Sequence, residues 1–326
     1  MIVRLEPFGT LIDCALDSNF LDTLIKHDVP ISYSCGNGNC NMCALEQVAF
    51  DDGRSFLTGS AISRPASAKR LACQIQVQEN IAVHLPQERP VQTPAHLKLR
   101  AKVECVGAIH PSIMRLVCTL DRPVNFLPGQ HFSVSFSKSV KRKYSAANLS
   151  GEASLVFYIE RHEEGVATGL LEDELAAGDT LVIEGPYGNS YLIPDDSTPV
   201  LLASVGVGFG ALVSAMESLK TTNPTRRVIA IIDIPEGLEE MIQTLLLPAR
   251  NKLMNADVKF ISLYKSIGRT SKPQNVSEAI REMPQNLRGW SANVFGGFVA
   301  MMPIRNSLID QGADPQLIYL EPYIPS

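Results

Sequence analysis

Four cysteines have a spacing that could hold an iron–sulfur cluster. Cys35, Cys40 and Cys43 form a C-x4-C-x2-C pattern, and Cys73 follows in a separate segment. Plant-type [2Fe–2S] sites have this spacing, because one tight loop supplies three thiolates and a distant segment supplies the fourth. The loop reads CGNGNCNMC, and its glycines and asparagines tolerate the left-handed backbone that turns N–H groups toward cluster sulfurs. The pattern predicts that these four cysteines bind a [2Fe–2S] cluster.

Two other uses of these cysteines are less favoured. Zinc sites usually take paired C-x2-C knuckles, and the loop contains a single pair. The chain has seven cysteines, an odd number, and its N-terminus lacks a basic segment followed by a clean apolar stretch. We therefore expect a reducing, cytoplasmic location rather than a disulfide framework. The remaining cysteines, Cys14, Cys105 and Cys118, are expected to be small buried apolar residues.

A second group of residues could bind a flavin. In the segment RKYSAAN, Arg142 could neutralise a pyrophosphate and Tyr144 could pack on a planar ring. The Ser145 hydroxyl could hydrogen-bond a ring nitrogen. Residues 165–168 precede an expected helix, LLEDEL, whose N-terminal N–H groups would suit a phosphate. Each piece alone is a weak signal, since an isolated R-x-Y-S more often marks a plain strand end.

A third group could bind a nicotinamide dinucleotide. The segment VLLASVGVGFGALVSAM fits a strand, a glycine turn at Gly206, Gly208 and Gly210, and a helix that would receive a pyrophosphate. The next apolar strand ends at Asp233, and an acidic residue there suits a free ribose hydroxyl and repels a 2′-phosphate. We therefore expect NADH to be preferred over NADPH. Arg226 and Arg227 lie at the other end of that strand and should be too distant to reverse the preference.

The elements that must position these groups change in character along the chain. Between residues 98 and 193, short alternating runs separated by turn signals predict an antiparallel sheet or barrel. From residue 198, apolar runs alternate with helical segments, which predicts a parallel, doubly wound sheet. A proline-rich stretch at 85–98 indicates a linker. We therefore predict three domains, spanning residues 1–88, 98–195 and 196–326.

Composition excludes several classes of protein. The 326 residues are 45% hydrophobic and 19% charged, which excludes a disordered chain or a coiled coil. The net charge of −5 leaves no basic excess to hold a nucleic-acid backbone. Residues 199–216 are apolar and about long enough to cross a membrane, but their clustered glycines favour a buried strand, turn and helix. We expect neither a nucleic acid nor a membrane as partner.

The motifs together resemble a known family, the reductase components of multicomponent aromatic-ring-hydroxylating oxygenases of the naphthalene and carbazole dioxygenase type. ISYSCGNGNCNMCALEQV with RLACQIQV resembles the plant-type ferredoxin domain, and RKYS with the later glycine turn resembles the flavin domain of the ferredoxin–NADP reductase superfamily. The resemblance implies an α+β multidomain chain: a β-grasp [2Fe–2S] domain, an antiparallel β-barrel with FAD, and an α/β doubly wound nicotinamide domain. The flavin contacts that it implies are Arg142, Tyr144, Ser145, Gly165, Val166 and Thr168. The motif Gly185-Pro186-x-Gly188 fits the same pattern, as a turn that closes the barrel.

The same resemblance extends to the C-terminal third, with departures. VFGGFVAMMP resembles the family's C-G-x-x-x-M segment, with Gly296 where a cysteine contacts the nicotinamide and with Gly297 retained. The family closes with an aromatic residue stacked on the flavin, and Tyr323 is the candidate, so Ser145 and Tyr323 are the candidate catalytic residues. Other positions also differ from the usual family residues: Asn41, Lys143, Val207, Gly210, Ala211 and Pro235. We expect Gly296 to leave a gap that a cysteine would fill with a gain in hydride-transfer rate, unless a neighbour such as Phe298 already fills it.

The implied function is electron transfer from NADH through FAD and the [2Fe–2S] cluster to a terminal oxygenase or an intermediary ferredoxin, in aromatic hydrocarbon catabolism. Two alternatives stay open. The departures in the nicotinamide segment would suit an electron-transfer or binding subunit that no longer oxidises NADH. A reductase of a di-iron monooxygenase would share every motif and differ only in its partner.

Overall fold

The computed structural model divides the chain into two compact units, Met1–Val91 and Gln92–Ser326. The residues that it describes are 1–6, 9–27, 29, 31, 38, 43–48, 68–84, 94–162, 165–188, 190–234, 236–262 and 275–323. The second unit contains both the predicted barrel and the predicted nucleotide-binding domain, so the boundary that we place between residues 195 and 196 stays a prediction.

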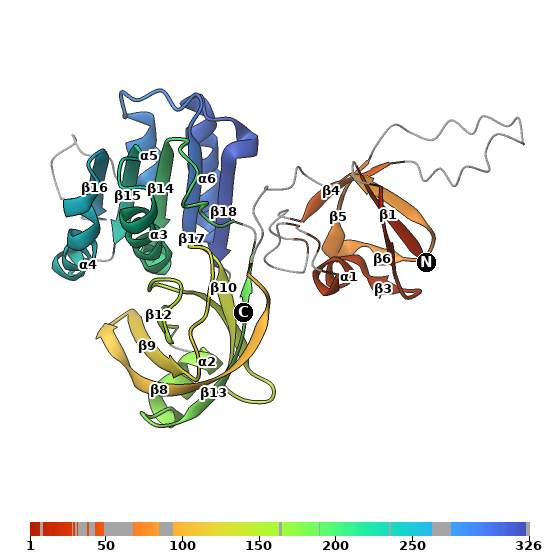
Figure 1. The fold of residues 1–326 in the computed structure, drawn as a ribbon, viewed down its shortest axis with the longest axis horizontal. Helices are drawn as coiled ribbons and strands as arrows, with labels where there is room; N and C mark the ends of the chain where they lie inside the picture. The colour runs from red at the N-terminus through yellow and green to blue at the C-terminus, as the bar shows by residue number, and fades with distance from the viewer. Residues whose placement is uncertain are drawn as a thin grey trace, which may run out of the picture. The chain divides into compact units, whose positions relative to one another are not determined.

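The first unit is a five-stranded mixed sheet packed against one helix (Figure 1). Its strand order is β2-β1-β7-β4-β5, with β1 and β7 parallel and the other neighbours antiparallel. Helix α1 (Phe20–Lys26) buries Phe20 and Leu24 against the sheet, and the Asn19 side chain caps it by accepting from the Asp22 N–H at 3.3 Å. The strands of this sheet are β1 (Ile2–Glu6), β2 (Thr10–Asp13), β4 (Ala44–Val48), β5 (Ala68–Leu71) and β7 (Ile81–His84). A second pairing joins β3 (Ser18–Asn19) to β6 (Gln76–Val77).

The second unit begins with a six-stranded antiparallel sheet in the order β11-β10-β13-β8-β9-β12. The sheet closes on itself just beyond β11, where the Ala147 N–H donates to the Val156 carbonyl at 2.9 Å. Alternating residues such as Phe132 and Phe157 fill its interior completely. Its strands are β8 (Leu97–His110), β9 (Ile113–Leu120), β10 (His131–Ser135), β11 (Lys141–Ser145), β12 (Ser154–Glu160) and β13 (Thr180–Tyr187). This is the antiparallel barrel that the alternating runs predict.

A five-stranded parallel sheet follows, in the order β16-β15-β14-β17-β18. Its strands are β14 (Val200–Val205), β15 (Val228–Ile234), β16 (Ala256–Ser262), β17 (Ser291–Gly297) and β18 (Ile318–Tyr323). Helices α3 (Phe209–Thr222) and α4 (Glu239–Lys252) pack together, and so do α5 (Val276–Arg281) and α6 (Phe298–Asp310). The strand order reverses between β14 and β17, and open sheets of this kind bind ligands at that switch point, outside the carboxyl ends of the strands. The doubly wound fold is therefore as predicted.

The apolar stretch at 199–216 forms β14, a short turn (η4, Gly206–Gly208) and the first half of α3. This is the strand, turn and helix that its clustered glycines predict. Within the described residues, no helix is long and apolar enough to cross a membrane.

The barrel and the parallel sheet share one core. Tyr158 of the barrel packs on Phe209 at the start of α3, with 4.6 Å between ring centroids. The Ser214 hydroxyl of α3 donates to the Asn148 carbonyl at 2.8 Å. Gly210 lies between the two layers, because a β-carbon there would be 2.9 Å from the Tyr158 ring and 3.2 Å from the Ala147 β-carbon. This close approach gives Gly210 a packing role at the start of α3.

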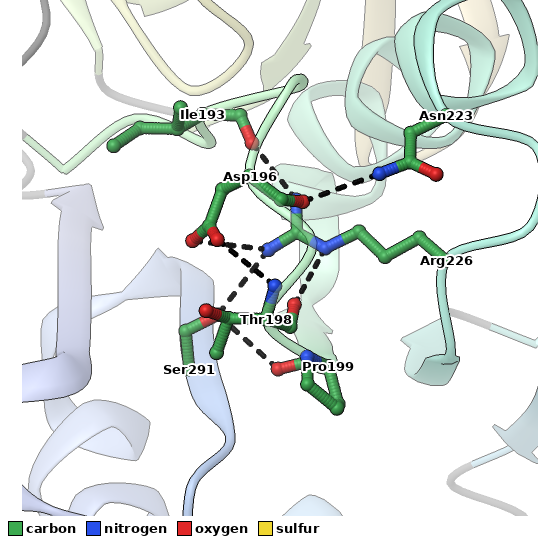
Figure 2. A network of polar contacts seen from close by, with 7 residues as sticks. All are labelled: Ile193, Asp196, Thr198, Pro199, Asn223, Arg226 and Ser291. Carbon is green, nitrogen blue, oxygen red and sulfur yellow. Dashed lines mark hydrogen bonds and ion pairs between the residues drawn. The ribbon is translucent and has the colours of Figure 1, made fainter.

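A buried arginine fastens the segment between barrel and sheet to the amino end of the sheet (Figure 2). The Arg226 side chain is almost fully buried and donates to the carbonyls of Thr198 at 2.7 Å and Ile193 at 2.8 Å. It also reaches the Ser291 hydroxyl at 3.5 Å and the Asp196 carboxylate at 3.7 Å. Arg226 therefore precedes β15 at the edge of the sheet opposite Asp233, as the sequence predicts. Its fork of donors satisfies backbone groups that would otherwise be buried without partners.

We expect Arg226→Lys to lower the Tm of the second unit, because lysine cannot serve two carbonyls with a planar fork and leaves buried acceptors unpaired. Losing such charge-assisted bonds costs about 2 kcal/mol, or about 4–8 °C in a unit of this size. Thermal unfolding followed by circular dichroism measures the change. Arg227→Lys is the matched control, since Arg227 is exposed and lies over the Trp290 ring at 5.1 Å. Equal shifts for both variants would contradict the role of Arg226.

Candidate functional site

The first unit brings two of the predicted cluster cysteines into neighbouring segments. Cys43 directly precedes β4, and Cys73 lies in the short helix η2 (Ala72–Gln74). The Ala72 N–H donates to the Cys43 carbonyl at 2.9 Å, and both cysteines are buried. Gly38, in the loop that carries the other two, has φ +90°, and a β-carbon there would collide with the Gln74 side chain. Gly38 therefore lies beside the segment that carries Cys73, which fits a cluster held near Cys43 and Cys73.

Cys35 and Cys40 lie outside the described residues, so their part in the ligand set stays a prediction. Of the remaining cysteines, Cys14 and Cys118 are buried as expected, and burial raises the pKa of the Cys118 thiol to about 12. Cys105 is exposed, so the expectation that it is buried is wrong. The register of β8 shifts between Val103 and Cys105, and this bulge places Cys105 outside the barrel.

The predicted flavin residues of β11 face two sides of the strand. Tyr144 faces the barrel interior, where it packs on Phe136 and Phe157 with centroid distances of 6.2 and 6.0 Å, and burial raises its pKa. Arg142, two residues before Tyr144, lies on the same face of the strand, is half-buried, and donates to the Lys141 carbonyl at 2.9 Å, whereas Ser145 lies on the other face. The Tyr144 ring therefore packs against aromatic side chains of the barrel, and its contact with the flavin ring stays a prediction.

Ser145, the last residue of β11 in the barrel, lies close to Tyr323, the last residue of β18 in the parallel sheet. The Ser145 hydroxyl is buried and lacks a well-formed hydrogen bond within the described structure. Burial raises the pKa of the Tyr323 phenol, and the nearby Ser145 hydroxyl opposes that rise. A buried hydroxyl without a full partner is costly unless a ligand completes it. The pair therefore fits a polar ring edge that both hydroxyls could reach.

The predicted phosphate-binding residues form the first turn of a helix. We expected residues 165–168 to precede the helix, but α2 (Val166–Gly169) begins at Val166 and continues into the helical turn η3 (Leu170–Glu174). Thr168 is buried and its hydroxyl accepts from the His162 N–H at 3.3 Å, whereas the Val166 side chain is exposed. No side chain caps the first turn, with Gly165 at the N-cap. These N–H groups could therefore donate hydrogen bonds to a phosphate.

The glycine turn after β14 lies directly against the end of β17. Gly206 has φ +58°, with open space where a β-carbon would be. A β-carbon on Gly208 would collide with the Phe295 carbonyl oxygen, and one on Gly296 would collide with the Val205 carbonyl oxygen. Gly296 also has φ +137°, which L-residues with side chains rarely adopt. Both glycines are therefore required for two backbone segments to touch at the switch point of the sheet.

This contact contradicts the gap that we expect at Gly296 from the sequence. Backbone atoms of Val205 already fill the space, so a cysteine there would overpack the site rather than fill a vacancy. The expected gap at Gly296 is therefore wrong. Gly297 differs, because it caps α6 with φ −61° and has nothing within 4 Å of its β-carbon position. The predicted contact of Gly297 with a nicotinamide stays a prediction.

Asp233 lines a cavity of about 250 Å³ at the carboxyl edge of the parallel sheet. Val205 of β14, Ser277 of α5 and Ile304 of α6 also line it. Asp233 is 4% exposed, its Oδ1 atom has no hydrogen-bond partner within the described structure, and burial raises its pKa to about 6. A carboxylate in this state fits a hydroxyl-bearing ligand, because a hydroxyl would donate to the unpaired oxygen.

No motif in the sequence singles out the buried histidine and glutamate that lie beside Ser145. His131 of β10 and Glu321 of β18 are joined by a 2.7 Å contact between Nδ1 and Oε1, and both are buried. The clue available in the sequence was one charged or titratable residue inside each of two apolar strands, HFSVS and IYLEPY. Such residues are rarely buried without a specific partner.

Comparison with known proteins assigns both units. A family model for a 2Fe-2S iron-sulfur cluster binding domain matches residues 3–78, and one for an oxidoreductase FAD-binding domain matches residues 100–191. The aromatic O-demethylase reductase subunit of an Amycolatopsis species is 30% identical over 229 residues, which cover 68% of this chain and 69% of that protein. The chain belongs to this family of iron–sulfur flavoprotein reductases. The predicted [2Fe–2S] cluster and FAD are thereby confirmed as its cofactors.

Two further similarities extend over the whole chain. The ferredoxin--NAD(P)(+) reductase component of the naphthalene 1,2-dioxygenase/salicylate 5-hydroxylase systems of a Ralstonia species is 27% identical, covering 100% of this reductase and 99% of its relative. The crystal structure of an Amycolatopsis cytochrome P450 reductase has a TM-score of 0.73 at 23% identity, covering 99% of both chains. The latter shows that the fold is shared over the whole chain.

We expect Gly296→Ala to destabilise the reductase by about 2–4 kcal/mol, because the new methyl group combines an unfavourable backbone angle with a backbone collision. Denaturant unfolding of the full chain measures this loss. Gly297→Ala is the adjacent control and should change stability by less than about 1 kcal/mol, since the space beside it is open. Equal effects at the two positions would show that the turn and β17 are not in backbone contact.

Proposed function

We propose that this reductase passes electrons from NADH, through FAD and the [2Fe–2S] cluster, to the terminal oxygenase or an intermediary ferredoxin of an aromatic-ring-hydroxylating system. The observation that carries the proposal is the similarity over 100% of the chain to a ferredoxin--NAD(P)(+) reductase component of dioxygenase and hydroxylase systems. Both cofactor-binding domains are present in one chain, so a two-electron donor and a one-electron acceptor can be served by the same protein.

The residues of this chain have distinct parts in the proposed reaction. FAD supplies the chemistry that accepts a hydride and returns its electrons singly, and the cluster carries one electron at a time. Ser145 and Tyr323 would orient the flavin ring through their facing hydroxyls, and Arg142 would neutralise phosphate charge. The first turn of α2, with Gly165, Val166 and Thr168, would hold the same phosphates through backbone N–H groups.

The proposed nicotinamide site lies at the switch point of the parallel sheet. Gly206, Gly208 and Gly210 begin the turn and helix that would face the pyrophosphate. Gly296 and Gly297 would pass beside the nicotinamide, and Asp233 would accept a ribose hydroxyl in the cavity at the end of β15. A 2′-phosphate at that hydroxyl would bring its charge against a buried carboxylate, which supports NADH as the preferred donor.

The alternative, a subunit that no longer oxidises NADH, rests on the altered glycine segments. Gly210 and Gly296, two of the positions that depart from the family pattern, each have a packing reason in this chain, so these two departures do not by themselves argue for loss of NADH binding. An anaerobic titration with NADH, followed by absorbance, separates the two functions. Bleaching of both flavin and cluster is expected. Bleaching by dithionite but not by NADH would contradict the proposal and favour the alternative.

The four cysteines are proposed as the cluster ligands, and each should be required. We expect Cys43→Ser and Cys73→Ser to abolish most of the rhombic EPR signal of the reduced protein while FAD stays bound, because a hydroxyl is a far weaker iron ligand than a thiolate. Cys35→Ser and Cys40→Ser should do the same. Cys14→Ser is the control for a buried cysteine of the same domain, and its signal should persist. An unchanged signal in all four ligand variants would overturn the assignment.

Asp233 should make NADH binding depend on pH. Since burial raises its pKa to about 6, the empty site is protonated below that pH and ionised above it. A ribose hydroxyl donates best to the carboxylate, so the Kd for NADH should fall as pH rises from 5 to 7. Asp233→Asn should raise the Kd at pH 7 by about tenfold, flatten this pH dependence and narrow the discrimination against NADPH. Isothermal titration measures all three, and a pH dependence unchanged in the variant would exclude Asp233 as its source.

A further inference from the structure

His131 and Glu321 form a buried link between two elements far apart in the sequence. His131 is the first residue of β10 in the barrel, and Glu321 lies in β18, the edge strand of the parallel sheet. A carboxylate can only accept hydrogen bonds, so the 2.7 Å contact requires that Nδ1 of His131 carries the proton and donates it. Both side chains are less than a tenth exposed, so this bond has no competition from bulk water.

The link is in register with the two candidate catalytic residues. His131 pairs directly with Ser145 across β10 and β11, and Glu321 precedes Tyr323 by two residues, on the same face of β18. The His131–Glu321 contact and the approach of Ser145 to Tyr323 are therefore neighbouring rungs between the same pair of surfaces. Fixing one rung fixes the separation of the other.

The surrounding backbone closes over the pair. Gly188 has φ +97°, and a β-carbon there would be 3.0 Å from His131 Nδ1 and 3.6 Å from Glu321 Oε2. Glycine in the G-P-x-G motif thus lets the chain cover the bond and exclude water. The Ser190 hydroxyl donates to the Leu320 carbonyl, and the Asn293 amide donates to the Ser190 carbonyl at 3.3 Å, so polar contacts flank the pair on the sheet side.

Because the His131–Glu321 hydrogen bond is buried, it helps to determine the position of β18. A carboxylate removed from water is stable only when it is hydrogen-bonded, so without a donor at Nδ1 we expect the Glu321 side chain to move toward solvent. Among the described strands, β18 pairs with β17 alone, and the bond to His131 ties it to β10 of the barrel, so a movement of Glu321 would displace the end of β18. Tyr323 would move with it, away from Ser145.

We propose that His131 is a positioning residue, whose Nδ1–H bond to Glu321 holds the C-terminal strand so that Tyr323 stands against Ser145 at the flavin site. The proposal rests on the proposed placement of the flavin at Ser145 and Tyr323. Nothing in it requires His131 to touch the flavin or to exchange protons with it.

Two histidine substitutions separate this role from simple space filling. His131→Asn keeps an amide donor at the position of Nδ1, whereas His131→Gln moves the donor to the position of Nε2. In full-length protein stripped of flavin and titrated with FAD, we expect His131→Asn to keep the wild-type Kd. His131→Gln should raise the Kd by about tenfold, or about 1.4 kcal/mol. Glu321→Leu should produce the same rise by a second route, and His84→Phe, at an exposed histidine of the first unit, should leave the Kd unchanged.

A double-mutant cycle with Tyr323→Leu then tests positioning directly. If His131 acts through Tyr323, adding His131→Gln to Tyr323→Leu changes the FAD Kd by less than about twofold. A full tenfold rise in that background, or equal Kd values for His131→Asn and His131→Gln, would overturn the proposal. An unchanged FAD Kd in the Tyr323→Leu single variant would instead contradict the placement of the flavin at Tyr323, so the two failures are distinguishable.

Discussion

The backbone contact between the turn after β14 and the end of β17 constrains the rest of the second unit. Two segments can approach to this distance only where neither carries a β-carbon, and Gly208 and Gly296 meet that condition from opposite sides. The contact fixes where α3 begins, and the start of α3 in turn packs Phe209 and Gly210 against Tyr158 of the barrel. The backbone contact therefore contributes to the relative position of the barrel and the parallel sheet, together with the Tyr158–Phe209 packing.

Around that contact, the second unit keeps several polar groups buried at a cost. Within the described part of the chain, Ser145 lacks a full hydrogen-bond partner, His131 Nε2 has none, and Asp233 has an unpaired oxygen and a raised pKa. In an ordinary core each would be replaced by an apolar residue, because an unsatisfied buried group costs free energy of folding. Their positions coincide with the proposed flavin site and with the cavity at the carboxyl edge of the sheet, where ligands would satisfy them. Ligand binding would therefore offset the loss in free energy of folding that these unpaired groups cause in the ligand-free protein.

Arg226 and the His131–Glu321 pair each join distant chain segments, one at the amino ends and the other at the carboxyl ends of the strands of the parallel sheet. At the amino edge, the guanidinium of Arg226 gathers carbonyls from the segment that leaves the barrel, and at the carboxyl edge the histidine holds a carboxylate of the last strand. In both places a buried charged group joins chain segments that are distant in sequence. Each link is directional, so it sets an orientation as well as a contact.

The sequence alone determined the cluster spacing, the antiparallel and parallel sheets and the family, because these depend on local patterns: cysteine intervals, strand alternation, and glycine turns between strand and helix. It also placed Asp233 and Arg226 at opposite ends of one strand, since strand direction follows from the chain. Only the tertiary structure decided that Gly296 faces backbone instead of a gap, that a bulge in β8 places Cys105 outside the barrel, and that His131 contacts Glu321. Each of these depends on which distant segment lies within a few ångströms, and no local pattern carries that distance.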